Sequence, residues 1–133
     1  MHVPFVDLPA QHQRLQRELD DAVCEVSRRG DFIGGRAVAA FEEEFARFTG
    51  ARYGVGVGSG GAAIELALRG LGIGPGDEVI TAANTFIATV LAIVAVGATP
   101  ILVDIDAATY TIDPRLIDAA ITSRTRAVVP VHL

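Results

Sequence analysis

The chain contains no lysine, because all 11 of its basic residues are arginines. It also has no tryptophan and only one cysteine, Cys24, so no internal disulfide can form and a reducing, cytoplasmic compartment is expected. Without lysine the chain cannot carry a P-loop nucleotide site, which requires that residue. The net charge of −5, with no basic cluster, argues against nucleic acid as a partner.

Long apolar segments are also missing. The longest apolar run, Ile87 to Ala98, has about 12 residues and is interrupted by Thr89, which is too short to span a bilayer. The first ten residues, MHVPFVDLPA, lack the basic and apolar regions of a signal peptide. We therefore expect neither a membrane partner nor a targeting segment. Half of the residues are nevertheless hydrophobic, enough for the core of one domain.

Residues 1–50 are predicted to form a segment of two amphipathic helices. Apolar residues recur with helical spacing over Gln11–Arg29 and stop at Gly30. A second helix carries Phe41, Phe45 and Phe48 on one face and ends before Gly50. The acidic run Glu42–Glu44 is interpreted as the solvated face of this helix, and we expect no metal site.

Residues 51–133 are predicted to form an α/β domain with a parallel sheet and helices on both faces. The expected strands are Tyr53–Val57, Glu78–Ala82, Pro100–Val103 and Ala127–Val131. The expected helices are Ala62–Leu71, Thr85–Val96 and a third from Pro114, capped by Asp113, to about Ile121. Strands that alternate with helices indicate a parallel sheet, whose carboxyl edge carries the functional site.

A glycine turn, Gly58–Gly61, links the first predicted strand to the next helix. Free N–H groups at a helix start bind anions, most often a phosphate, and small residues with special backbone angles, such as Gly60, would let the anion approach. The segment Gly56–Gly61 also fits the G-x-G-x-x-G pattern of nicotinamide sites, but the next strand ends in Thr81–Asn84 without the required acid. A packing turn without a ligand is the third interpretation.

Phe86 follows the next predicted strand, at the same edge of the sheet as the glycine turn. An aromatic ring at this place can cover the flat pyridine ring of pyridoxal 5'-phosphate (PLP), the phosphate of which would bind at the turn. Phe86 also begins an apolar helix, so a plain core position is an equal alternative.

The order of several sequence blocks resembles that of a known enzyme family. These blocks run from about Pro4 to Leu133 and read PFVDL, GDFIGG, VAAFEEEFARFTGARYGVGVGSG, GIGPGDEVITAANTFIAT, GATPILVDID, TYTIDP and AVVPVHL. The chain thus resembles the nucleotide-sugar aminotransferases of the DegT/StrS group, which are fold-type-I PLP enzymes. The α/β part would then belong to the large, PLP-binding domain of that fold, preceded by the two N-terminal helices.

The resemblance implies an aminotransferase that moves an amino group from glutamate or glutamine to a nucleotide-linked keto sugar, as a homodimer. It implies that Ser59, Gly60, Gly61 and Ala62 receive the PLP phosphate and that Phe86 stacks on the pyridine ring. The family usually has threonine where this chain has Gly61, so one hydroxyl donor would be missing. Neither the sugar nor the nucleotide can be named from the sequence.

The resemblance places the Schiff-base lysine and the acid for the pyridine nitrogen beyond Leu133. We therefore expect an N-terminal third of the family's chain, with no catalytic residue of its own and no activity by itself. Asp104 and Asp106 are expected to cap loops, and His132 receives no role. Two alternatives remain: a non-catalytic relative that binds a phosphorylated ligand or a partner protein, and, more distantly, an NAD(P)-dependent oxidoreductase domain.

Overall fold

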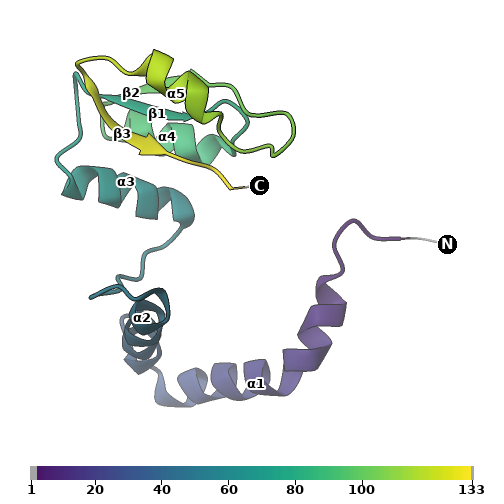
Figure 1. Cartoon of the computed structure of the whole chain (residues 1–133). Helices are drawn as coiled ribbons and strands as arrows, with labels where there is room; N and C mark the ends of the chain where they lie inside the picture. Colours follow the sequence, from purple (N-terminus) through teal and green to yellow (C-terminus); the bar gives the residue numbers. More distant parts are fainter. Residues whose placement is uncertain (1–2, 133) are drawn as a thin grey trace. The chain divides into compact units, whose positions relative to one another are not determined.

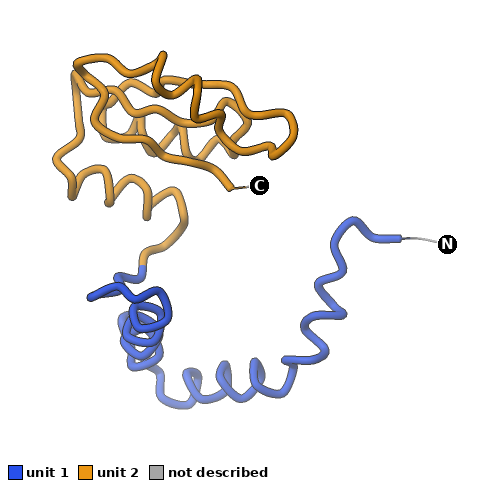
Figure 2. Tube along the Cα trace, viewed as in Figure 1, with its two compact units in different colours: residues 1–56 blue, residues 57–133 orange. Residues whose placement is uncertain are grey.

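A computed structural model describes residues 3–132 of the chain. The chain divides into two compact units, residues 1–56 and residues 57–133 (Figure 2). Our division into a helical segment, residues 1–50, and an α/β domain, residues 51–133, stays a prediction.

The first unit contains the helices α1, Leu8–Arg29, and α2, Arg36–Thr49 (Figure 1). Helix α1 begins earlier than predicted because the Asp7 carboxylate caps it, accepting a hydrogen bond of 3.1 Å from the Ala10 N–H. It ends at Gly30, whose φ of 70° lies in the left-handed region that favours glycine. Both predicted helices are confirmed.

The predicted solvated role of the acidic run does not hold for Glu42 of α2, which has a structural contact. Its carboxylate accepts a hydrogen bond of 2.6 Å from the Gly56 N–H. A Cβ atom added at Gly54 would lie 2.5 Å from the Glu42 carbonyl oxygen, so only glycine allows this approach. The segment after α2 is therefore held against the helix by the Glu42 side chain, and Gly54 allows the close approach because it has no side chain.

The predicted strand Tyr53–Val57 is wrong. Within residues 3–132, none of these five residues joins a β-ladder, and the side chains of Tyr53 and Val55 are exposed. Alternating valine and glycine favour an extended backbone, but a strand also needs a neighbour to pair its N–H and C=O groups.

The second unit is built on a parallel sheet in the order β2–β1–β3 (Figure 1). Its strands are β1, Glu78–Ala82, β2, Thr99–Val103, and β3, Thr125–Val129. Its helices are α3, Gly60–Gly70, α4, Ile87–Ala95, and α5, Pro114–Ala120. Each of these elements begins and ends within two residues of its predicted bounds. The predicted α/β fold is confirmed.

Helices cover both faces of this sheet, as predicted. On one face Val79 packs with Leu68 of α3 and Ile93 of α4. On the other face Ile80 of β1 lies in a second cluster, against which Ile117 of α5 packs. The alternation of side chains along β1 thus supplies two separate cores.

Glu78 is a buried carboxylate at the start of β1, with 3% of its surface exposed. The Thr122 hydroxyl donates to it at 2.5 Å, and the Arg124 Nε donates at 2.9 Å. These hydrogen bonds, first that of Thr122 and then that of Arg124, lower the pKa of Glu78 below its ordinary value of 4.5. The charged form of Glu78 therefore ties β1 to the turn that precedes β3.

We expect Glu78→Gln to flatten the acid side of the stability curve. Because the pKa of Glu78 is lower in the folded than in the unfolded chain, its stabilisation is fully present above pH 4.5 and disappears as the pH falls through the folded value. Urea midpoints at several values between pH 3 and pH 7 measure this. The control Asp118→Asn removes an exposed acid of the same unit. Parallel acid limbs for Glu78→Gln and the unchanged chain would contradict the prediction.

Candidate functional site

The predicted anion site begins where Ser59 caps α3. Ser59 is extended, with φ −166° and ψ 164°, and its Oγ accepts a hydrogen bond of 3.1 Å from the Ala62 N–H. Its carbonyl oxygen accepts a second bond of 3.0 Å from the Ala63 N–H. The Ser59 hydroxyl hydrogen is still able to donate, because Oγ serves the helix only as an acceptor.

The first turn of α3 leaves two donors for an anion. In an α-helix the first N–H groups have no partner within the helix, and here the cap satisfies only that of Ala62. Across residues 3–132, no acceptor is paired with the N–H groups of Gly60 and Gly61. Both point out of the positive end of the helix dipole, which favours a phosphate.

The backbone angles of this turn differ from our expectation. Neither Gly60 nor Gly61 has a positive φ, so the expectation of special angles at Gly60 is wrong. The reason is that both residues already belong to α3 and have helical angles. A Cβ at Gly60 would meet no atom within 4 Å, whereas one at Gly61 would lie 3.6 Å from the Ala88 Cβ. Their small size leaves open space beside the free N–H groups.

Phe86 lies across from this turn, at the start of α4. Its side chain is 78% exposed, so within the described residues it is not part of the core. A pocket of about 440 Å³ brings the predicted residues Ser59, Gly60, Gly61 and Phe86 together. The structure thus joins two segments that sequence reasoning could only place at the same edge of a sheet. That they bind a cofactor stays a prediction.

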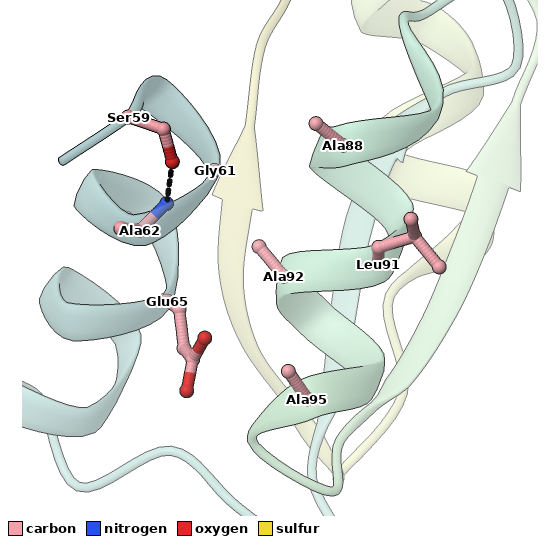
Figure 3. Close-up of a pocket in the computed structure, with 8 residues that line it drawn as sticks. All are labelled: Ser59, Gly61, Ala62, Glu65, Ala88, Leu91, Ala92 and Ala95. Atoms are coloured by element: carbon pink, nitrogen blue, oxygen red, sulfur yellow. Dashed lines mark hydrogen bonds between the residues drawn. The ribbon is translucent and has the colours of Figure 1, made fainter.

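A second hollow of about 360 Å³ adjoins the first and lies between α3 and α4 (Figure 3). Ala62, the remaining predicted residue, lines it from α3, together with Glu65. Ala88, Ala92 and Ala95 point from α4 toward α3, and the Glu65 side chain is directed into the gap (Figure 3). Ala62 therefore lines this second hollow, and its N–H donates to the Ser59 Oγ.

Two residues of α4 that sequence reasoning did not select also line the 440 Å³ pocket, Ala88 and Thr89. The Thr89 Oγ1 lies 2.9 Å from the Thr85 Oγ1, and the Thr89 N–H donates to the Phe86 carbonyl oxygen at 3.1 Å. The helical spacing of Thr89 from Phe86 is the signal that could have revealed it. This pair of threonines fixes the backbone that carries the Phe86 ring.

The other candidate residues have structural roles or none. Asp104 accepts from the Ile105 N–H at 2.8 Å, and Asp106 accepts from the N–H groups of Ala108 and Thr109 at 2.8 and 3.2 Å. The expected loop-capping roles of Asp104 and Asp106 are therefore confirmed. His132 is exposed and again receives no role.

The 440 Å³ pocket can bind but has no group for acid–base chemistry. None of its lining residues has an ionisable side chain. The described part of the chain contains no cluster of three or more His, Cys, Asp or Glu residues suited to a metal ion. Over the same residues, no helix has the length and apolar character needed to cross a membrane. The pocket offers backbone donors, the hydroxyls of Ser59 and Thr89, and an aromatic face.

Comparison with known proteins identifies the family. A sequence model of the DegT/DnrJ/EryC1/StrS aminotransferase family matches residues 13–133. The chain is 50% identical over 131 residues to a dTDP-3-amino-3,4,6-trideoxy-alpha-D-glucose transaminase of Streptomyces venezuelae, covering 98% of this chain and 35% of that protein. It is 46% identical over 133 residues to a pleiotropic regulatory protein of Geobacillus stearothermophilus, covering 100% and 36%. The chain thus spans about a third of the length of these relatives.

Solved structures agree with the sequence comparison. The X-ray structure of S. venezuelae DesV matches with a TM-score of 0.93 and 50% identity, over 98% of this chain and 35% of that one. The structure of NtdA from Bacillus subtilis with bound cofactor PMP matches with a TM-score of 0.90 and 39% identity, over 98% and 30%. Family model, relatives and structures converge, and the chain belongs to the DegT/DnrJ/EryC1/StrS aminotransferase family.

Proposed function

We propose that this chain provides the phosphate and ring contacts of a PLP-dependent aminotransferase. The whole protein would act on a nucleotide-linked keto sugar, with glutamate or glutamine as the amino donor. The observation that carries the proposal is the pocket that joins the start of α3 to the exposed Phe86. Family membership supports PLP as the ligand of this pocket, and similar proteins are named as transaminases of dTDP- and UDP-linked sugars.

The residues of the pocket fit PLP. The N–H groups of Gly60 and Gly61, the Ser59 hydroxyl and the helix dipole suit a phosphate dianion. Phe86 offers an exposed ring face for the pyridine, and no carboxylate lines the pocket to repel the phosphate. When bound, PLP supplies the electron sink for amino transfer. The residues of this chain hold and orient it, and the proton-transferring groups come from elsewhere in the protein.

The proposal is tested by titrating the purified 133-residue chain with PLP and with pyridoxal, which lacks the phosphate. We expect PLP to bind more tightly. Gly60→Val should abolish this preference, because its side chain enters the open space beside the free N–H groups. Ser59→Ala should weaken PLP binding about 10- to 150-fold, the value of a hydrogen bond to a charged group.

The matched control is Gly70→Val, at the other end of α3, where an added Cβ also meets no atom within 4 Å. It changes the helix in the same way but leaves the pocket intact. Equal PLP binding by the unchanged chain, Gly60→Val and Ser59→Ala would mean that the turn only packs, and would contradict the proposal.

Gly61→Thr is expected to tighten PLP binding. A Cβ at Gly61 would lie 3.6 Å from the Ala88 Cβ and 3.8 Å from the Ser59 Oγ, both ordinary contacts, so the backbone accepts a residue with a side chain here. The isosteric control Gly61→Val adds the same bulk without a hydroxyl. We expect the threonine variant to bind about 10- to 150-fold more tightly than the valine variant, the range for a hydrogen bond to a charged group. Equal dissociation constants would show that no donor is needed at this position.

We extend the proposal to the setting of the protein. The acidic net charge and the single cysteine favour a cytoplasmic protein with small-molecule partners, the nucleotide sugar and the amino donor, and neither nucleic acid nor membrane. The whole protein would be a homodimer. Sedimentation of the whole protein, compared with its sequence mass, measures this directly.

A further inference from the structure

The position of α3 decides whether the anion donors face Phe86. Helix α3 packs on α4, with Leu68 buried in the same cluster as Ile93. Toward its N-terminal end, α3 meets α4 through small residues, with Gly61 opposite Ala88 (Figure 3). Small side chains allow a close approach, but they do not interlock, so the angle between the helices needs another constraint.

Arg69 supplies a polar link between the two helices. Its Nε donates to the Glu65 Oε1 at 3.0 Å, within α3. Its Nη2 donates to the carbonyl oxygen of Ala95, the last residue of α4, also at 3.0 Å. The cation therefore lies at the negative end of the α4 dipole and satisfies a carbonyl that the helix itself leaves unpaired. Glu65 holds the planar guanidinium in this direction.

We propose that Arg69 is a positioning residue for the anion site. By bridging Glu65 and Ala95 it fixes one end of α3 on α4, and thereby the place of Gly60 and Gly61 at the other end. An 11-residue helix is about 16 Å long, so a tilt of about 10° at Arg69 would move its first turn by about 3 Å. Such a shift exceeds the tolerance of a hydrogen bond to a phosphate.

An ordinary surface ion pair would not have this effect. Pairs of Glu and Arg four residues apart on one helix contribute little, and Arg47 with Glu43 on α2 is such a pair, at 2.9 Å. Arg69 differs because its second bond crosses to a carbonyl oxygen of another helix. Arg47→Gln is therefore the matched control for Arg69→Gln.

The first test needs no ligand and measures the approach of the helices. Gly61→Cys and Ala88→Cys are introduced together with Cys24→Ser, which leaves a single pair of thiols. The 3.6 Å between the Cβ positions of residues 61 and 88 suits a disulfide. We expect Arg69→Gln to slow formation of this disulfide at least about fivefold, and Arg47→Gln to leave the rate unchanged. Equal rates in Arg69→Gln and the parent would overturn the inference.

The second test links the position of α3 to binding, and it rests on the proposed function for the identity of the ligand. Arg69→Gln should weaken PLP binding but leave pyridoxal binding unchanged, because only the phosphate uses the first turn of α3. If the parent chain does not prefer PLP to pyridoxal, the proposed function fails, while the disulfide rates still decide the role of Arg69. An unchanged preference in Arg69→Gln counts against that role.

A third variant covers a failure to fold. Should Arg69→Gln lose its helical circular dichroism, Arg69→Lys is measured instead. Lysine keeps one charged donor but cannot bridge two acceptors with a planar fork. A disulfide rate below that of the parent then supports the proposal, and a parent-like rate overturns it.

Discussion

Truncating Ile93 to alanine is expected to lower the free energy of unfolding by about 2–5 kcal/mol. Ile93 is fully buried in α4, where it packs with Leu68 of α3, Val79 of β1 and Val96. The loss combines the hydrophobic transfer energy of the removed carbons with the cavity that they leave. Because this cluster joins α3, α4 and the sheet, no single neighbour can close the cavity. Urea unfolding followed by circular dichroism measures the change.

Ile87→Ala is the matched control, since it removes the same atoms from the same helix. Ile87 is 57% exposed, so its truncation should change the free energy of unfolding by about 0.5 kcal/mol or less. If both variants lost the same amount, Ile93 would not be the link between α3 and the sheet. The packing of α3 and α4, which line the pocket, on this core would then differ from that described above.

PLP is expected to leave no label on any internal residue of the 133-residue chain after reduction with borohydride. Covalent attachment of the cofactor requires an unprotonated amine, and the sequence contains no lysine. Arginine does not replace it, because the guanidinium stays protonated in proteins. The N-terminal amine is the one remaining amine of the sequence that can react. Peptide mapping by mass spectrometry locates any label.

Two controls accompany this measurement. Acetylation of the N-terminus should remove the remaining label. Ser123→Lys, in an exposed turn, provides an amine that can react and shows that the reduction works. A stoichiometric label at a defined internal position of the unchanged chain would contradict the prediction and point to a nucleophile that we have not identified.

Much of the secondary structure in both units follows from local sequence signals. Asp113 and Pro114 predicted the start of α5, and the Asp113 carboxylate indeed accepts from the Arg115 N–H at 2.9 Å. Gly50 predicted the end of α2, where it has a φ of 71°. Glu78–Ala82 was predicted with the bounds that the structure gives. The two helix boundaries depend only on neighbours in the sequence, whereas β1 also needs its pairing with β2 and β3 to form a strand.

The candidate site was predictable only as two separate pieces. The residues Ser59 to Ala62 predicted a helix start with free N–H donors. Phe86 predicted an aromatic ring after the next strand, at the same edge of the sheet. Their meeting in one pocket depends on how α3 packs against α4. The helical spacing of Thr89 from Phe86 could have suggested it, but only this packing places Thr89 on the pocket wall.

The sequence by itself determined the approximate places of the helices and of three strands, and it indicated which residues could hold an anion. Tertiary structure decided that Tyr53–Val57 forms no strand, that Glu42 binds the Gly56 N–H, and that Arg69 reaches from α3 to the end of α4. The physical reason is the range of the interactions. Caps, turns and side-chain periodicity act within a few residues, whereas strand pairing and links between helices need partners that only the folded chain brings close.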